Sequence, residues 1–123
     1  MSIVLNTKTY TFRGFNPQSI STYAETSAGV PNGFSWLTNK VEGADGTGKV
    51  KSRWKLKVPV VAAGDTDCGC AGDRLRDIAV DIVVTSDRGS TAAERTDVAD
   101  RIEDLVASPE FRGSIINLIQ ASV

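Results

Sequence analysis

Basic side chains alternate with mostly apolar ones along one stretch of the chain, Lys49-Val50-Lys51-Ser52-Arg53-Trp54-Lys55-Leu56-Lys57-Val58. Successive residues of a β-strand face opposite sides of a sheet. The stretch therefore predicts a single strand with one basic face and one apolar face, in which Ser52 is the exception on the apolar side.

The basic face of this strand has two interpretations. Lysine suits exposed strands and sheet edges, so the face can simply be solvated. However, like charges spaced about 6.6 Å apart along a strand repel one another, and no acidic residue falls between positions 46 and 64. A polyanion would neutralise the row, so we expect this face to bind one.

Other short segments rich in strand-forming residues surround the basic strand and are separated by turn residues. Asn6-Thr7 suits the turn of a hairpin, and the Gly-rich segment 42–48 suits a hairpin loop. That segment lacks the Lys-Ser/Thr pair of a phosphate-binding loop. The additional predicted strands cover residues 3–5, 9–12, 20–24, 34–41 and 78–84.

The last third of the chain predicts two helices. Thr91 and Glu94 have the spacing of a capping box, and Val98 and Leu105 belong to an apolar stripe at helical spacing. Ser108-Pro109 then supplies an N-cap and a first helical residue for a second helix.

These elements predict an α+β fold in one domain, residues 1–123, with a hairpin at 1–13, an antiparallel meander at 19–86 and two C-terminal helices at 91–120. The apolar stripes of the helices need burial against the apolar sheet face. A domain of this size offers little sheet to cover both stripes. We therefore expect a homodimer in which the helices of each chain lie over the partner's sheet.

Composition argues against an enzyme. The chain of 123 residues contains no histidine, which removes the commonest general base and the commonest metal ligand. We predict no catalytic residue, no cofactor and no metal site.

The net charge of −1 alone does not suggest a nucleic-acid partner, but acidic residues gather in the helices and basic ones in the strand. No signal peptide or membrane-length apolar run is present, so we expect no membrane partner.

Several short motifs, taken in their order and spacing, resemble the coat proteins of single-stranded RNA bacteriophages, particularly the Q-beta group. The resemblance spans nearly the whole chain. The motifs that carry it are Arg13-Gly14-Phe15-Asn16-Pro17, Ala28-Gly29-Val30-Pro31, the basic strand from Lys51 to Pro59, Glu94-Arg95, and Leu105-Val106-Ala107-Ser108-Pro109.

The resemblance implies a structural capsid protein that dimerises, assembles into an icosahedral shell and packages single-stranded RNA. It places the protein in the virion, assembled in the cytoplasm of a bacterial host. The family also implies repression of translation by binding of an RNA hairpin. A dimeric nucleic-acid-binding regulator that never forms a shell is the alternative. The expected RNA contacts are Lys49, Lys51, Arg53, Lys55, Lys57, Ser35 and Asn39.

The last strand departs from the family pattern. A tyrosine that stacks on a base, and an Asn or Asp two residues later, correspond here to Asp77 and Ala79. A carboxylate cannot stack and repels phosphate, so we do not expect hairpin recognition of the familiar kind. Asp77 and Asp81 can instead pair with the basic strand.

The two cysteines, Cys68 and Cys70, lie in a long loop. A bond between them would close a very small, strained ring. The family carries loop cysteines that link subunits, which implies an inter-subunit disulfide, and two free thiols are the alternative. A redox enzyme built on this pair is disfavoured by the lack of histidine and by the Gly-rich loop, and zinc by the lack of further ligands.

Overall fold

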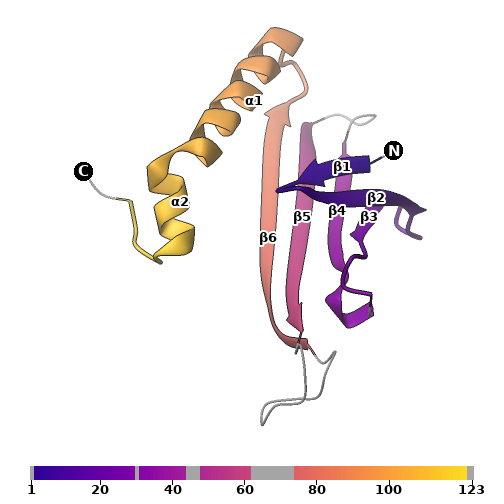
Figure 1. Ribbon diagram of the computed structural model, residues 1–123. Helices are drawn as coiled ribbons and strands as arrows, with labels where there is room; N and C mark the ends of the chain where they lie inside the picture. The colour runs from indigo at the N-terminus through magenta and orange to yellow at the C-terminus, as the bar shows by residue number, and fades with distance from the viewer. Residues whose placement is uncertain (1, 30, 44–47, 62–73, 122–123) are drawn as a thin grey trace. The chain divides into compact units, whose positions relative to one another are not determined.

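A computed structural model of the protein describes residues 2–29, 31–43, 48–61 and 74–121. The chain divides into two compact units, Met1–Thr85 and Ser86–Val123, and each is described by itself. Within the described residues, strands come first and two helices follow, as the sequence predicts (Figure 1). The assignment of all 123 residues to one domain stays a prediction.

The first unit is built on an antiparallel meander. The strands follow one another in the sheet in chain order, and the neighbouring pairs from β1–β2 to β4–β5 are antiparallel. The predicted order of strands is confirmed. The strands are β1 (Ser2–Leu5), β2 (Lys8–Phe15), β3 (Ser21–Glu25), β4 (Ser35–Glu42), β5 (Lys49–Val61) and β6 (Arg74–Asp87).

Strand β5 runs past its predicted end at Val58 and continues through Pro59 to Val61. Proline lacks the N–H that a sheet ladder needs. The register between β4 and β5 ends at the pair Trp36 and Lys57, so Pro59 lies beyond the last paired residue of β4. Its missing N–H therefore costs no hydrogen bond to β4.

The core lies on one face of the curled sheet. Tyr10, Tyr23 and Leu37 are buried, and Ile3, Leu5, Phe12, Trp54 and Leu56 pack against them. Figure 1 shows the β1–β2 hairpin lying across β5, with its turn close to β6. In agreement, Ile3 and Leu5 line an apolar hollow of about 370 Å³ together with Val80 and Ile82 of β6. The predicted apolar side of β5 thus faces the hairpin.

The second unit contains helices α1 (Ala92–Ala107) and α2 (Pro109–Ile116). The predicted capping box is confirmed: Glu94 N donates to Thr91 Oγ1 at 3.2 Å, and Thr91 N donates to Glu94 Oε1 at 3.1 Å. Ser108 caps α2, and its Oγ accepts from Phe111 N at 3.2 Å. Neither of these described helices is long and apolar enough to cross a membrane.

Helix α2 is shorter than the sequence predicts. It ends at Ile116, so the predicted helical region up to residue 120 is wrong at its C-terminal end. Asn117 forms the C-cap, and Leu118 has a φ of 57°, in the left-handed region that a right-handed helix cannot use. Ile119 therefore lies outside the helix.

Candidate nucleic-acid interface

The side of β5 that carries the basic residues forms an exposed surface with its two neighbouring strands. Residues 49, 51, 53, 55 and 57 are all exposed, whereas the alternate residues Val50, Ser52, Trp54 and Leu56 are half-buried. The alternation predicted from the sequence is therefore confirmed. We call this surface the basic face, and it comprises Lys49, Lys51, Arg53, Lys55 and Lys57 of β5, Trp36, Thr38, Lys40 and Glu42 of β4, and Asp77, Ala79 and Asp81 of β6.

The register between β4 and β5 determines which residues of β4 join the basic face. Directly opposite residues of an antiparallel pair lie on the same side of a sheet. Trp36 pairs with Lys57, Thr38 with Lys55, and Lys40 with Arg53. An aromatic ring, a hydroxyl group and a further cation therefore lie beside the row of cations on β5.

Strand β6 contributes carboxylates to the same face. Lys57 Nζ lies 3.3 Å from Asp77 Oδ2, and Arg53 Nε lies 4.0 Å from Asp81 Oδ1. The expectation that both aspartates pair with the basic strand is confirmed. All four side chains keep at least a third of their surface exposed, so each pair adds little stability. The pairs matter because they reduce the positive charge of the face.

The remaining positive charge includes Lys51 and Lys55, and the carboxylate of Glu42, which faces Lys51 across the strands, is paired with Lys40. Lys55 lies between Arg53 and Lys57 along β5, and Ala79 lies between the two aspartates along β6. In the part of the chain that the structure describes, no ion pair involves Lys51 or Lys55. These two lysines can therefore interact with an anion without first breaking an ion pair.

Among the described residues, the basic face includes a larger and a smaller hollow. The larger, of about 390 Å³, is lined by residues from three strands, among them Trp36, Lys55, Ala79 and Asp81. The smaller, of about 180 Å³, lies where the β2–β3 connection meets the face and includes Gln18, Ile20, Lys40 and Arg53. Both include Lys55.

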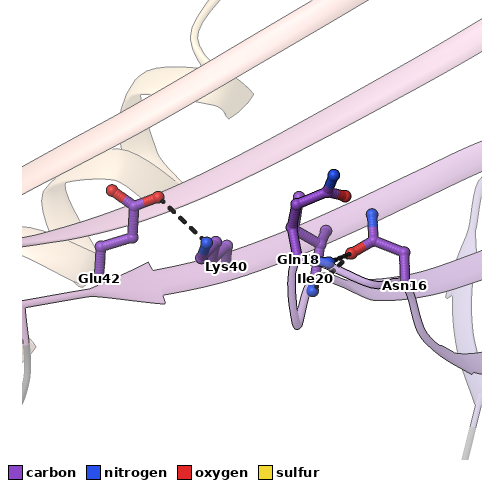
Figure 2. Close-up of polar contacts among 5 residues, drawn as sticks. All are labelled: Asn16, Gln18, Ile20, Lys40 and Glu42. Atoms are coloured by element: carbon purple, nitrogen blue, oxygen red, sulfur yellow. Dashed lines mark hydrogen bonds and ion pairs between the residues drawn. The ribbon is translucent and has the colours of Figure 1, made fainter.

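The wall of the smaller hollow is held by short-range polar contacts (Figure 2). Asn16 Oδ1 accepts hydrogen bonds from the backbone N–H groups of Gln18 at 2.9 Å and Ile20 at 3.0 Å. On β4, Lys40 Nζ lies 3.6 Å from Glu42 Oε1. The Lys40 charge is thus partly compensated, and Asn16 fixes the turn that carries Gln18.

Ser35 and Asn39 do not belong to the basic face, which corrects their inclusion among the expected RNA contacts. Asn39 pairs with Trp54 on the apolar side, and its Nδ2 donates to Arg53 O at 3.1 Å. Ser35 is buried, and its Oγ donates to Lys57 O at 2.7 Å. Because that hydroxyl hydrogen is used, the 2.7 Å contact between Tyr10 and Ser35 has the Tyr10 hydroxyl as donor.

Sequence reasoning missed Trp36, Thr38 and Lys40 as members of the basic face. Their alternation along β4 is visible in the sequence, but the side of β4 that matches the basic side of β5 depends on the register. Cys68 and Cys70 lie outside the described residues, so the expected inter-subunit disulfide stays a prediction. Among the described residues, no cluster of three or more His, Cys, Asp or Glu residues could hold a metal ion.

The fold is shared with phage capsid proteins of known structure. The virus-like particle of Beihai levi-like virus 21 has 18% sequence identity and a TM-score of 0.80, over 100% of this chain and 96% of that chain. The coat protein of bacteriophage EMS014 has 20% identity and a TM-score of 0.78, over 99% and 98%. The protein capsid of bacteriophage GA has 17% identity and a TM-score of 0.73, over 91% and 90%.

At these identities the structural likeness establishes the fold alone. No curated protein sequence matches the chain. The family is established by a separate finding, because the model of the levivirus coat protein family matches residues 2–120, nearly the whole chain. The chain therefore belongs to the levivirus coat protein family and is a structural capsid protein and not an enzyme.

Proposed function

We propose that the protein forms homodimers that assemble into a closed icosahedral shell, and that the basic face binds the packaged single-stranded RNA inside it. The protein would then reside in the virion after assembly in the cytoplasm of a bacterial host. The single observation that carries the RNA proposal is the row of exposed cations on one side of β5, opposite a side that packs against apolar residues.

The chemistry of the basic face suits an RNA backbone. Lysine and arginine bind phosphates chiefly through charge, which positions a nucleic acid without reading its sequence. Lys51 and Lys55 supply charge that no ion pair among the described residues offsets. Such a face supports packaging of RNA of many sequences, as a shell protein requires.

Exposed apolar surfaces support the dimer. On β6, Ile78, Val80 and Ile82 lie on the side opposite Asp77 and Asp81, and all three are exposed within the single chain. Helices α1 and α2 bury none of their residues. A surface of this kind is unfavourable in water, and a second copy of the chain can cover it. In the proposed dimer, the helices of each chain lie over the partner's sheet.

Repression of translation would require a hairpin contact other than the tyrosine stacking of the family. Asp77 and Ala79 occupy the positions where a stacking tyrosine and a polar residue would recognise a hairpin. Asp77 is engaged by Lys57 and repels phosphate. If the protein represses translation, it recognises the hairpin through a contact of another kind.

Electron microscopy of the protein expressed in bacteria, with the 260/280 nm absorbance ratio of the same fraction, tests the proposal. We expect closed particles of uniform diameter that contain nucleic acid. Light scattering of the disassembled protein should give a dimer, and a monomer at micromolar concentration would refute dimerisation. A soluble dimer that forms no particles would refute assembly into a shell and would favour the non-assembling, nucleic-acid-binding regulator.

A variant with fewer positive charges on the basic face can show whether RNA packaging is lost while shell assembly is kept. The double variant Lys51→Gln and Lys55→Gln should still form particles, because the apolar surfaces are unchanged, but the particles should contain less RNA. Lys8→Gln is the matched control, since it removes the same kind of charge in the β1–β2 hairpin. Equal RNA content in all three proteins would exclude the basic face as the RNA site.

A further inference from the structure

We propose that the larger hollow of the basic face binds one unpaired base of single-stranded RNA, which stacks on the indole ring of Trp36. This inference rests on the proposed function, because it assigns a second mode of contact to the same face. It adds a preference for single strands over duplexes, which phosphate contacts alone do not provide.

Trp36 is a partly exposed aromatic residue on the basic face. The residue is 39% exposed, and its neighbours across the strands are the buried Ala24 of β3 and the exposed Lys57 of β5. The other tryptophan, Trp54, lies on the apolar side and packs against the core. Exposed aromatic rings beside cations are a common feature of proteins that bind single-stranded nucleic acid, because every base can stack on them.

The surroundings leave the indole ring accessible. The ring of Phe34 lies 6.5 Å away between centroids, tilted by 53°, so it does not stack in parallel on Trp36. Lys57 Nζ is engaged by Asp77 of β6. Ala79 of β6 lines the same hollow as Trp36 and carries only a methyl group, so its side chain is too short to cover the indole ring.

The hollow beside Trp36 has the groups that a nucleotide needs. Its volume of about 390 Å³ lies between Trp36, Thr38, Lys55 and Asp81. Lys55 can bind the phosphate of a base stacked on Trp36, since no ion pair among the described residues occupies it. Thr38 offers a hydroxyl group and Asp81 a carboxylate for the edges of a base or for a ribose 2′-hydroxyl group.

Stacking on Trp36 would distinguish single-stranded RNA from an RNA duplex. The bases of a duplex are stacked on one another and cannot insert between side chains, whereas single-stranded loops can present an unstacked base. A duplex can still meet Lys51 and Lys55 through its phosphates. Trp36 should therefore contribute to the binding of single strands and not to the binding of duplexes.

The test compares nucleic-acid-free wild type, Trp36→Leu and Phe15→Leu, each with a short single-stranded RNA and with an RNA duplex of the same length. Phe15 is the matched control, because it is an exposed aromatic residue that pairs with Ser21 on the other side of the sheet. We expect Trp36→Leu to weaken single-strand binding about 5- to 140-fold, the usual effect of losing one stacked base. Duplex binding by Trp36→Leu, and both affinities of Phe15→Leu, should stay unchanged.

Tryptophan fluorescence gives an independent readout. In Trp54→Phe, where Trp36 is the remaining tryptophan, the single strand should quench the emission and the duplex should not. In Trp36→Phe, where Trp54 remains, neither RNA should quench. If Trp54→Phe does not fold, the affinities of the Trp36 variants still decide the question.

The outcomes separate this proposal from the proposed function. If Trp36→Leu binds both RNAs as the wild type does, stacking is refuted and binding by charge stands. If Trp36→Leu loses both RNAs equally, Trp36 supports the shape of the face or a protein contact, and stacking is again refuted. If the wild type binds neither RNA, the RNA-binding function itself fails.

Discussion

Lys57 of β5 and Asp77 of β6 form an ion pair on the basic face, with Nζ and Oδ2 3.3 Å apart. Arg53 and Asp81 form a second, longer pair on the same two strands. The last strand of the sheet therefore reduces the positive charge that β5 presents. An RNA phosphate near Lys57 must compete with a carboxylate that is already in place, whereas a phosphate near Lys55 need not.

Removal of the Asp77 charge should strengthen RNA binding. In Asp77→Asn, Lys57 becomes available to a phosphate, and the repulsion from Asp77 disappears. We expect higher affinity for single-stranded RNA, with the slope of log affinity against log salt steeper by about 0.7, the value for one additional phosphate contact. Asp97→Asn is the control, because Asp97 is also in an exposed ion pair, with Arg101 on α1. An unchanged slope in Asp77→Asn would mean that Lys57 does not reach the RNA.

Lys55 should contribute more to RNA binding than the Lys57–Asp77 pair does. Lys55→Ala removes a charge that no ion pair among the described residues offsets, so the salt slope should fall by about 0.7. The double variant Lys57→Ala and Asp77→Ala removes one positive and one negative charge, so its slope should stay close to that of the wild type. Binding titrations across a range of salt concentrations measure both. A larger loss in the double variant than in Lys55→Ala would contradict the charge distribution described here.

Local sequence patterns are sufficient where the backbone alone sets the direction of a side chain. The period of two along 49–58 predicted both sides of β5, because side-chain direction in a strand follows from the backbone alone. It did not place Ser35 and Asn39 correctly and did not identify Trp36, because their side of the sheet depends on the register between β4 and β5. A shift of one residue moves every side chain to the opposite face. The end of α2 was missed for a similar reason, since no local residue type predicts the left-handed conformation of Leu118.

Ser35 should matter for stability and not for RNA binding. Its hydroxyl accepts from the buried Tyr10 hydroxyl and donates to Lys57 O. Ser35→Ala leaves the Tyr10 hydroxyl without this partner, which should lower the free energy of unfolding by about 1–3 kcal/mol. Tyr10→Phe should cost less, because Ser35 then keeps its bond to Lys57 O.

Urea unfolding at one protein concentration measures both variants, and a salt titration with RNA provides the second readout. The RNA salt slope of Ser35→Ala should equal that of the wild type, because Ser35 lies on the apolar side. A changed slope with unchanged stability would return Ser35 to the RNA interface and contradict the register.

The capping box of α1 should make the free energy of unfolding depend in part on pH. The hydrogen bond from the Thr91 backbone N–H, followed by the contact with the Thr91 side chain, holds the pKa of Glu94 below its ordinary value of 4.5. A carboxyl group whose pKa is lower in the folded state stabilises that state above its unfolded pKa. This contribution is lost as the pH falls through the lower, folded pKa.

Glu94→Gln isolates this effect, because glutamine can occupy the same position in a capping box but does not titrate. The difference in unfolding free energy between wild type and Glu94→Gln should be constant above pH 4.5 and should decrease as the pH falls below it. Thr91→Ala keeps the backbone N–H, so most of the pH dependence should persist in that variant. If the difference between wild type and Glu94→Gln did not change with pH, the hydrogen bond at the N-terminus of α1 would not be formed in solution.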